Sequence, residues 1–241
     1  MATSLDRLRA AVGADRVGAN VQLAPLTSFG IGGPADYLFD ARTTDELVLA
    51  VTLAREDGIA VTLIGGGSNI LVADGGIRGM VIRPKATRVA SAGDKVVCAD
   101  AGVTINGLVR WTIARGLGGL EAWAGMPGTI GGAIHGNAHY GGHRISEWMI
   151  SVSLLRRDGS VTDVPADEMA FGLDTSRPET TGDIVLRAAV RVVPGCDPAG
   201  LRTVARQSLV HRRRTQPLHM RSAGCAFQNP DPARDRLPAA V

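Results

Sequence analysis

Hydrophobic and polar positions follow a clear helical period near the start of the chain. Residues 43–46, Thr-Thr-Asp-Glu, have the spacing of a capping box, and apolar residues recur at helical intervals over 47–54 before Asp57-Gly58. Apolar runs at 36–39 and 60–64 flank this segment and are typical of buried strands. The order strand, helix, strand predicts a βαβ unit with parallel strands.

The pattern continues with short apolar runs, which predict strands at 70–72, 80–82 and 95–98. A second helix is predicted from Thr104, a suitable N-cap residue, to Gly116. These elements extend the mixed helix and strand character of the first part of the chain.

In the later part of the sequence, apolar positions mostly alternate as they do in β-strands. Alternating positions over 150–164, centred on Asp158-Gly159, predict a β-hairpin, and 184–193 is the longest strand candidate. Residues 195–198 break the pattern, and apolar spacing over 201–209 predicts a further helix. Together the elements indicate an α+β protein.

Composition and charge exclude several classes of protein. Of 241 residues, 45% are hydrophobic and 20% charged, which is enough to bury a core and excludes global disorder. The net charge of +3 gives no argument for nucleic acid binding. Cys98, Cys196 and Cys225 have no C-x-x-C spacing, so neither a disulfide framework nor zinc is indicated. Charged residues within 1–17 and the lack of a long apolar run predict a cytoplasmic protein without membrane insertion.

Two glycine-rich segments carry the candidate chemistry. The triple-glycine loop, residues 65–69 (Gly-Gly-Gly-Ser-Asn), exposes backbone N–H groups that suit a pyrophosphate, although a tight turn is the simpler interpretation of this loop alone. The second glycine segment, residues 125–133, again lacks large polar side chains, and Pro127 fixes one of its turns. Both together favour one long ligand such as a dinucleotide. Neither the G-x-G-x-x-G nor the P-loop motif occurs.

Four segments in this order resemble the family of UDP-N-acetylenolpyruvoylglucosamine reductases: residues 26–35, 64–71, 125–133 and 222–230. The resemblance extends from about Leu23 to the end of the chain. It implies a two-subdomain FAD-binding module of the vanillyl-alcohol oxidase (PCMH) type, followed by the start of a separate α+β substrate domain. We expect the divisions at residues 1–84, 85–195 and 196–241.

The same resemblance implies the reaction. An enzyme of this family uses noncovalent FAD and NADPH to reduce the enolpyruvyl ether of UDP-N-acetylglucosamine enolpyruvate to UDP-N-acetylmuramate in bacterial peptidoglycan synthesis. We therefore expect a UDP-sugar substrate, no nucleic acid partner and no metal. The residues expected to bind FAD are Ile64, Gly65, Gly66, Gly67, Ser68, Asn69, Gly125, Pro127, Gly128, Thr129, Gly131, Gly132, Asn137 and Ile184.

The last of the four segments implies the catalytic residue. Cys225 occupies the position of the family's proton donor, and a thiol can protonate the carbanion that hydride addition leaves. A lone cysteine is otherwise most often a small buried hydrophobe. Arg213 and Asn229 are the expected substrate contacts, with a turn-capping role before Pro230 as the alternative for Asn229.

The chain departs from the family pattern at several points. Asp174 stands where the family's Tyr-Arg-x-Ser segment has arginine, and Arg177 is a possible replacement. The stretch around Asn137 is one residue shorter than usual. His135, His139 and His143 have helical spacing, but the glycines between them argue against a metal-binding helix.

The end of the sequence is a further departure, because residues 231–241 follow the Cys225 segment where the family continues with most of a substrate domain. We therefore expect an incomplete substrate domain. This leaves a non-catalytic or truncated FAD- or nucleotide-binding relative as the alternative to an active reductase. A flavin oxidase of the same superfamily is a weaker third possibility, since the Cys225 segment is typical of the reductase.

Overall fold

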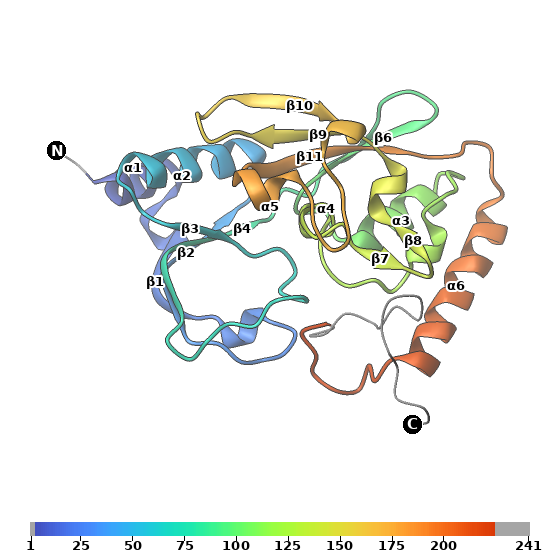
Figure 1. The fold of residues 1–241 in the computed structure, drawn as a ribbon, viewed down its shortest axis with the longest axis horizontal. Coiled ribbons are helices and arrows are strands. Elements are labelled where there is room, and N and C mark those ends of the chain that lie inside the picture. Colours follow the sequence, from blue (N-terminus) through green and yellow to red (C-terminus); the bar gives the residue numbers. More distant parts are fainter. Residues whose placement is uncertain (1–2, 225–241) are drawn as a thin grey trace, which may run out of the picture.

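The computed structural model describes residues 3–224 and contains two main sheets that follow one another along the chain (Figure 1). The first has the strand order β1-β2-β4-β3. Its strands are β1 (Val17–Gln22), β2 (Pro34–Ala41), β3 (Val61–Leu63) and β4 (Ile77–Pro84). Strands β2 and β3 both run parallel to β4, while β1 is antiparallel to β2. The predicted parallel βαβ unit is confirmed.

The helix of this unit, α2 (Thr44–Glu56), begins where the sequence predicts. The Thr43 hydroxyl accepts a hydrogen bond from the Glu46 N–H at 3.1 Å. Its buried face packs on the first sheet, together with α1 (Ser4–Val12), an element that the periodicity did not reveal. The N-cap at Thr43 and the buried apolar face therefore both support the predicted position of α2.

The strand predicted at 70–72 is wrong. These residues lie in the loop between β3 and β4, where Val72 is buried in a small cluster with Leu23 and Ala35 but Leu71 is 70% exposed. Local β-propensity has no effect here because no neighbouring strand is available to pair with this stretch.

The second sheet has the order β10-β9-β11-β6-β5 and is antiparallel throughout. Its strands are β5 (Val89–Ser91), β6 (Val96–Asp100), β9 (Met149–Leu155), β10 (Val161–Pro165) and β11 (Ile184–Arg191). The predicted hairpin over 150–164 is confirmed as β9 and β10, and the long strand as β11. A two-stranded ribbon consists of β7 (His139–Tyr140) and β8 (His143–Arg144).

Four helices accompany this sheet: α3 (Ile105–Ile113), α4 (Ile130–His135), α5 (Arg177–Thr181) and α6 (Pro198–Thr215). Short 3-10 turns occur at Ala14–Arg16, Ala24–Leu26, Glu121–Trp123, Ile145–Trp148 and Ala166–Glu168. Thr104 and Asp197 cap α3 and α6, so both predicted helices are confirmed. Leu201 and Ala205 of α6 belong to the core beneath the second sheet.

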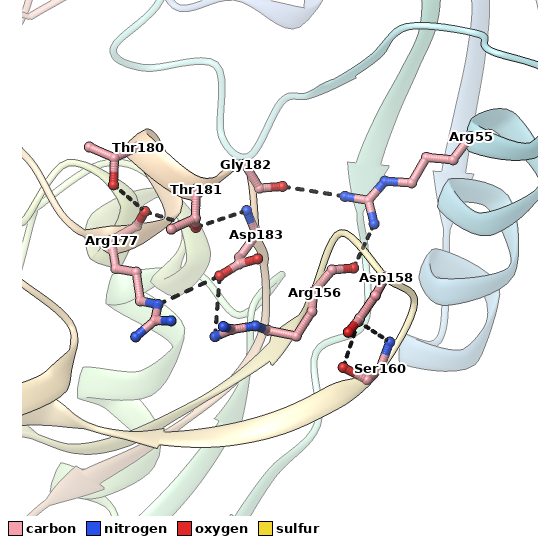
Figure 2. Close-up of polar contacts among 9 residues, drawn as sticks. All are labelled: Arg55, Arg156, Asp158, Ser160, Arg177, Thr180, Thr181, Gly182 and Asp183. Atoms are coloured by element: carbon pink, nitrogen blue, oxygen red, sulfur yellow. Dashed lines mark hydrogen bonds and ion pairs between the residues drawn. The ribbon is translucent and has the colours of Figure 1, made fainter.

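The two sheets share packing at one point. The hydrophobic core between α2 and the first sheet also contains three residues of the second sheet: Leu155, Ile184 and Leu186. Arg55 of α2 also donates to the carbonyl oxygens of Arg156 and Gly182, at 2.7 and 3.3 Å (Figure 2). The strands of each sheet fall within the proposed divisions 1–84 and 85–195, which, like 196–241, stay predictions.

None of the helices between residues 3 and 224 has the length and apolar content needed to cross a membrane.

Candidate cofactor site

The triple-glycine loop and the second glycine segment lie against each other. A Cβ atom on Gly65 would overlap the Thr129 hydroxyl, and one on Gly66 would lie 2.9 Å from the Cα of Gly128. Because these neighbours include backbone, a side chain would force the segments apart. Glycine is required here for close approach of two loops.

The loop that follows β1 closes over the triple-glycine loop. The Ser28 N–H donates to the Gly67 carbonyl at 2.8 Å, and Gly67 has a φ of +64°. A Cβ atom on Gly67 would overlap the Leu26 carbonyl oxygen. Both the left-handed backbone and the contact therefore require glycine at this position.

The last described residues reach the same place. A Cβ atom on Gly224, which has a φ of +88°, would overlap the Asn69 side-chain oxygen. Arg221 lies against Gly30 and donates to its carbonyl at 3.5 Å. All four sequence segments of the resemblance thus meet, as far as the fourth is described. The predicted residues Cys225 and Asn229 lie outside the described residues.

This meeting point offers unpaired hydrogen-bond donors. Within residues 3–224, no acceptor contacts the backbone N–H groups of residues 65–69, Gly128 or Thr129. Adjacent backbone N–H groups of a glycine-rich loop can bind phosphate oxygens. The site therefore fits the pyrophosphate of a dinucleotide such as FAD.

Neighbouring residues hold the second glycine segment in place. The Asn106 side chain accepts from the Gly125 N–H at 2.6 Å and donates to the Met126 carbonyl at 3.1 Å. The N–H of Gly131 donates to the Ala101 carbonyl at 2.9 Å. At the start of α4, the Thr129 hydroxyl caps Gly132 at 3.4 Å.

The remaining predicted cofactor residues lie around this meeting point. Ile64 is buried and donates to the Ile82 carbonyl at 3.1 Å. Pro127 is exposed beside Gly128. These positions are compatible with the predicted roles, which stay predictions.

Asn137 and Ile184 have partners within the fold. Asn137 is 1% exposed with a φ of +40°, and its amide donates to the Gly172 carbonyl at 2.7 Å. Its side-chain oxygen accepts from the Ser146 N–H at 3.3 Å. Ile184 starts β11 opposite Leu155 and is 8% exposed. Their cofactor contacts likewise stay predictions.

Arg213 is exposed on α6, whereas its neighbour Arg212, which the sequence interpretation missed, is 5% exposed. The Arg212 guanidinium lies 3.1 Å from the Met126 sulfur and 5.1 Å from the centre of the Tyr140 ring. It therefore packs beside the second glycine segment. Leu201, Ala205 and Arg212 share one face of α6, so helical spacing was the available signal.

Asp174, at the position of the family's arginine, lies in a tight turn. The Gly172 N–H donates to the Thr175 carbonyl at 3.0 Å, and Asp174 has a φ of +55°. Its carboxylate lies 3.2 Å from Nδ1 of His139, and both side chains are about half exposed. The turn is joined to the end of α4 by Ser176, whose hydroxyl donates to the His135 carbonyl at 2.8 Å. A carboxylate beside a histidine thus occupies this position.

Arg177, the possible replacement for the missing arginine, points elsewhere. Its Nε lies 3.7 Å from the carboxylate of Asp183, whose side chain is 3% exposed. Arg156 approaches the same carboxylate at 3.4 Å (Figure 2). Two guanidinium groups therefore balance one buried charge, and Arg177 has a role within the fold.

Residues 35–165 match the family model described as FAD binding domain. The fold is also similar to that of a glucose dehydrogenase variant of Phl p 4, with a TM-score of 0.56 and 15% identity over 80% of this chain and 44% of that one. The chain is thus an FAD-binding flavoprotein, and the predicted fold class, an FAD-binding module of the vanillyl-alcohol oxidase type, is confirmed.

Closer similarities define the family. A UDP-N-acetylenolpyruvoylglucosamine reductase of Synechococcus sp. (strain JA-3-3Ab) is 35% identical over 90% of this chain and 70% of the relative. The Rubrobacter xylanophilus protein of the same name is 40% identical over 85% of this chain and 68% of that relative. The crystal structure of the Thermus caldophilus reductase (MurB) gives a TM-score of 0.73 at 29% identity. The similarity covers 87% of this chain and 74% of that one. The chain belongs to the UDP-N-acetylenolpyruvoylglucosamine reductase family.

Proposed function

We propose that the protein is an FAD-dependent UDP-N-acetylmuramate dehydrogenase. It uses NADPH to reduce the enolpyruvyl ether of a UDP-sugar during peptidoglycan synthesis, and it acts in the cytoplasm, where we place its substrate. The observation that supports this most strongly is the convergence of all four family segments at the triple-glycine loop, with Gly224 against Asn69.

The chain's own residues have separate tasks in this reaction. The N–H groups of the triple-glycine loop, Gly128 and Thr129 hold the FAD pyrophosphate. Bound FAD supplies hydride transfer between NADPH and the enolpyruvyl group. The Cys225 thiol donates the proton to the carbon beside the substrate carboxylate, and Arg213 and Asn229 contact the substrate.

A second candidate function is flavin binding without the full reaction. Asp174 places a carboxylate where the family has a cation, and Arg177 is directed at Asp183 instead. A negative charge near a developing enolate would raise the energy of the transition state. In that case the protein would retain FAD and accept electrons from NADPH but turn over the enolpyruvyl substrate slowly.

Two measurements on the purified protein separate these functions. Flavin absorption bands test for FAD, and anaerobic mixing with NADPH tests reduction of the flavin. Addition of UDP-N-acetylglucosamine enolpyruvate should then reoxidise the flavin and yield UDP-N-acetylmuramate. Reduction by NADPH without reoxidation by the enolpyruvyl compound would favour the second candidate, and a colourless folded protein would contradict both.

A further inference from the structure

A groove of about 590 Å³ lies between α3 and α6, apart from the triple-glycine loop. Its apolar lining consists of Val109, Ile113, Ala114, Ala124, Ala205 and Leu209. Four of these side chains belong to buried or nearly buried core positions, so the floor is fixed by the fold. A volume of this size is typical of small-molecule sites, which measure roughly 300–1,000 Å³.

Three arginines stand at the edge of this apolar floor. Arg110 comes from α3, and Arg202 and Arg206 come from successive turns of α6. All three are exposed, and none makes a hydrogen bond or ion pair with its side chain to any residue in the described part of the chain. Cations thus face the groove from both of its helices.

Within residues 3–224, no carboxylate forms an ion pair with these three arginines. Glu121, in the 3-10 turn that packs against both helices, accepts a hydrogen bond from the Gly119 N–H at 2.6 Å. Neither α3 nor α6 contains an aspartate or glutamate. The carboxylate of Asp197 lies just before α6, where it accepts hydrogen bonds from the N–H groups of Ala199 and Gly200. Two further cations near the groove are directed elsewhere: Arg115 is stacked on Trp111 at 3.9 Å, and Arg212 lies against Met126 and Tyr140. The groove therefore combines an apolar floor with a net positive edge.

We propose that this groove binds an amphipathic anion, a small molecule with an aromatic or short aliphatic body and a phosphate or carboxylate group. The apolar body covers the floor, which removes its surface from water. The anionic group lies between Arg110 and the arginines of α6, because guanidinium groups bind such oxyanions through paired hydrogen bonds. The occupant is a second ligand, separate from FAD.

The groove is also connected to the cofactor site. Asn106 lines the groove and at the same time holds the Gly125 N–H and the Met126 carbonyl of the second glycine segment. Gly125, one of the residues expected to bind FAD, also lines the groove. The ligand site is thus next to the second glycine segment and apart from the triple-glycine loop.

Calorimetric titration of the FAD-loaded protein with 1-naphthyl phosphate tests the proposal, with 1-naphthol and inorganic phosphate as probes of each half of the ligand. We expect 1-naphthyl phosphate to bind at least tenfold more tightly than either. Saturating NADP⁺ should leave this binding unchanged. Displacement by NADP⁺, or equal binding of inorganic phosphate, would overturn the proposal.

Variants locate the binding. Replacing Arg110, Arg202 and Arg206 together by Gln should weaken 1-naphthyl phosphate binding at least tenfold and leave 1-naphthol unchanged. The control has Gln at three exposed arginines elsewhere: Arg42, Arg88 and Arg191. It should bind as the parent does.

A variant that fills the groove tests the apolar floor. Ala114→Phe changes an exposed residue at the end of α3 and should abolish binding of both naphthyl compounds while the flavin content is retained. Unchanged binding in this variant, or in the groove arginine variant, would place the ligand elsewhere. Binding of an acidic amphipathic peptide without any binding of 1-naphthyl phosphate would identify a protein-docking surface and overturn the small-molecule assignment.

Discussion

Gly66 and Gly128 lie directly against each other, since a Cβ atom on Gly66 would lie 2.9 Å from the Cα of Gly128. The contact joins the loop after β3 to the segment before α4, which belong to different sheets. Because the neighbour is a backbone atom, a side chain at Gly66 cannot be accommodated by a change of rotamer. The spacing between the two loops therefore depends on this pair.

We expect Gly66→Val to abolish FAD binding, because the branched side chain separates the two loops whose N–H groups we propose hold the pyrophosphate. The ratio of flavin to protein absorbance after purification measures this, and circular dichroism verifies the fold. The matched control is Gly75→Val, because a Cβ atom at Gly75 meets nothing within 4 Å. A folded Gly66→Val protein with full flavin content would contradict the cofactor assignment.

The proposed proton donor can be tested by separating the two half-reactions. Cys225→Ala should leave reduction by NADPH intact and slow turnover of the enolpyruvyl substrate by ~10²-fold or more, which is the usual contribution of a general acid. Cys225→Ser should retain much more activity because a hydroxyl can also donate a proton. Equal losses in both half-reactions would indicate a structural cysteine.

Asp174→Arg should increase the rate at which the enolpyruvyl substrate reoxidises the reduced protein, because it replaces a carboxylate by a cation at the position where the family resemblance implies contact with the developing enolate. The substitution carries a backbone cost of about 1–2 kcal/mol, since Asp174 has a φ of +55°. Asp174→Asn is the control, which removes the charge and keeps a residue that tolerates this backbone. A rate that does not differ among the three proteins would show that this position does not face the substrate.

Asp183→Asn should lower the free energy of unfolding by about 2–4 kcal/mol, because Arg156 and Arg177 would lose the buried charge that they share. The loss is somewhat below that of a fully buried pair, since both arginines keep 28% of their side-chain surface exposed. Urea titration gives the difference. Asp94→Asn, at an exposed residue, should change stability by less than about 0.5 kcal/mol, and a similarly small effect at Asp183 would contradict the charge balance.

The sequence predicted α2 and α3 correctly because capping residues and apolar spacing agree within each segment, and β11 because its apolar run is long. It failed at 70–72, where an apolar run has no neighbouring strand. It also missed α4, since Gly131 and Gly132 have low helix propensity. That helix is held by the Thr129 cap and by packing of Ile130 and Ile134 in the core, which only the tertiary structure reveals.

In the candidate site, too, the sequence revealed the local motifs but not their tertiary contacts. The two glycine-rich segments were recognisable because two such segments in one chain favour a shared ligand, but their contact is a tertiary relationship. The role of Arg177 depended on the direction of its side chain, which a sequence cannot give. Arg212 was hidden within a basic run in which only helical phase distinguishes the buried arginine from exposed Arg213.

Glu46 should make the stability of the protein depend on pH. Arg16 donates to both of its carboxylate oxygens, at 2.7 and 2.8 Å, and these hydrogen bonds, followed by one from the Arg42 N–H, lower the pKa of Glu46 although burial opposes them. A carboxylate whose pKa is lower in the folded state stabilises the fold above the unfolded pKa of about 4.3, and this contribution is lost as the pH falls through the folded value.

Glu46→Gln should therefore lower the free energy of unfolding by about 1.5–3 kcal/mol at pH 7, the usual value of hydrogen bonds to a charged group. The difference from the parent protein should shrink as the pH falls below about 4, because protonation then weakens the parent's own contact with Arg16. Urea titrations at several pH values measure both stabilities. Glu168→Gln, at an exposed glutamate, is the control and should follow the parent at every pH. A difference between the parent and Glu46→Gln that stays constant down to pH 3 would show that the contact with Arg16 contributes through packing and not through charge.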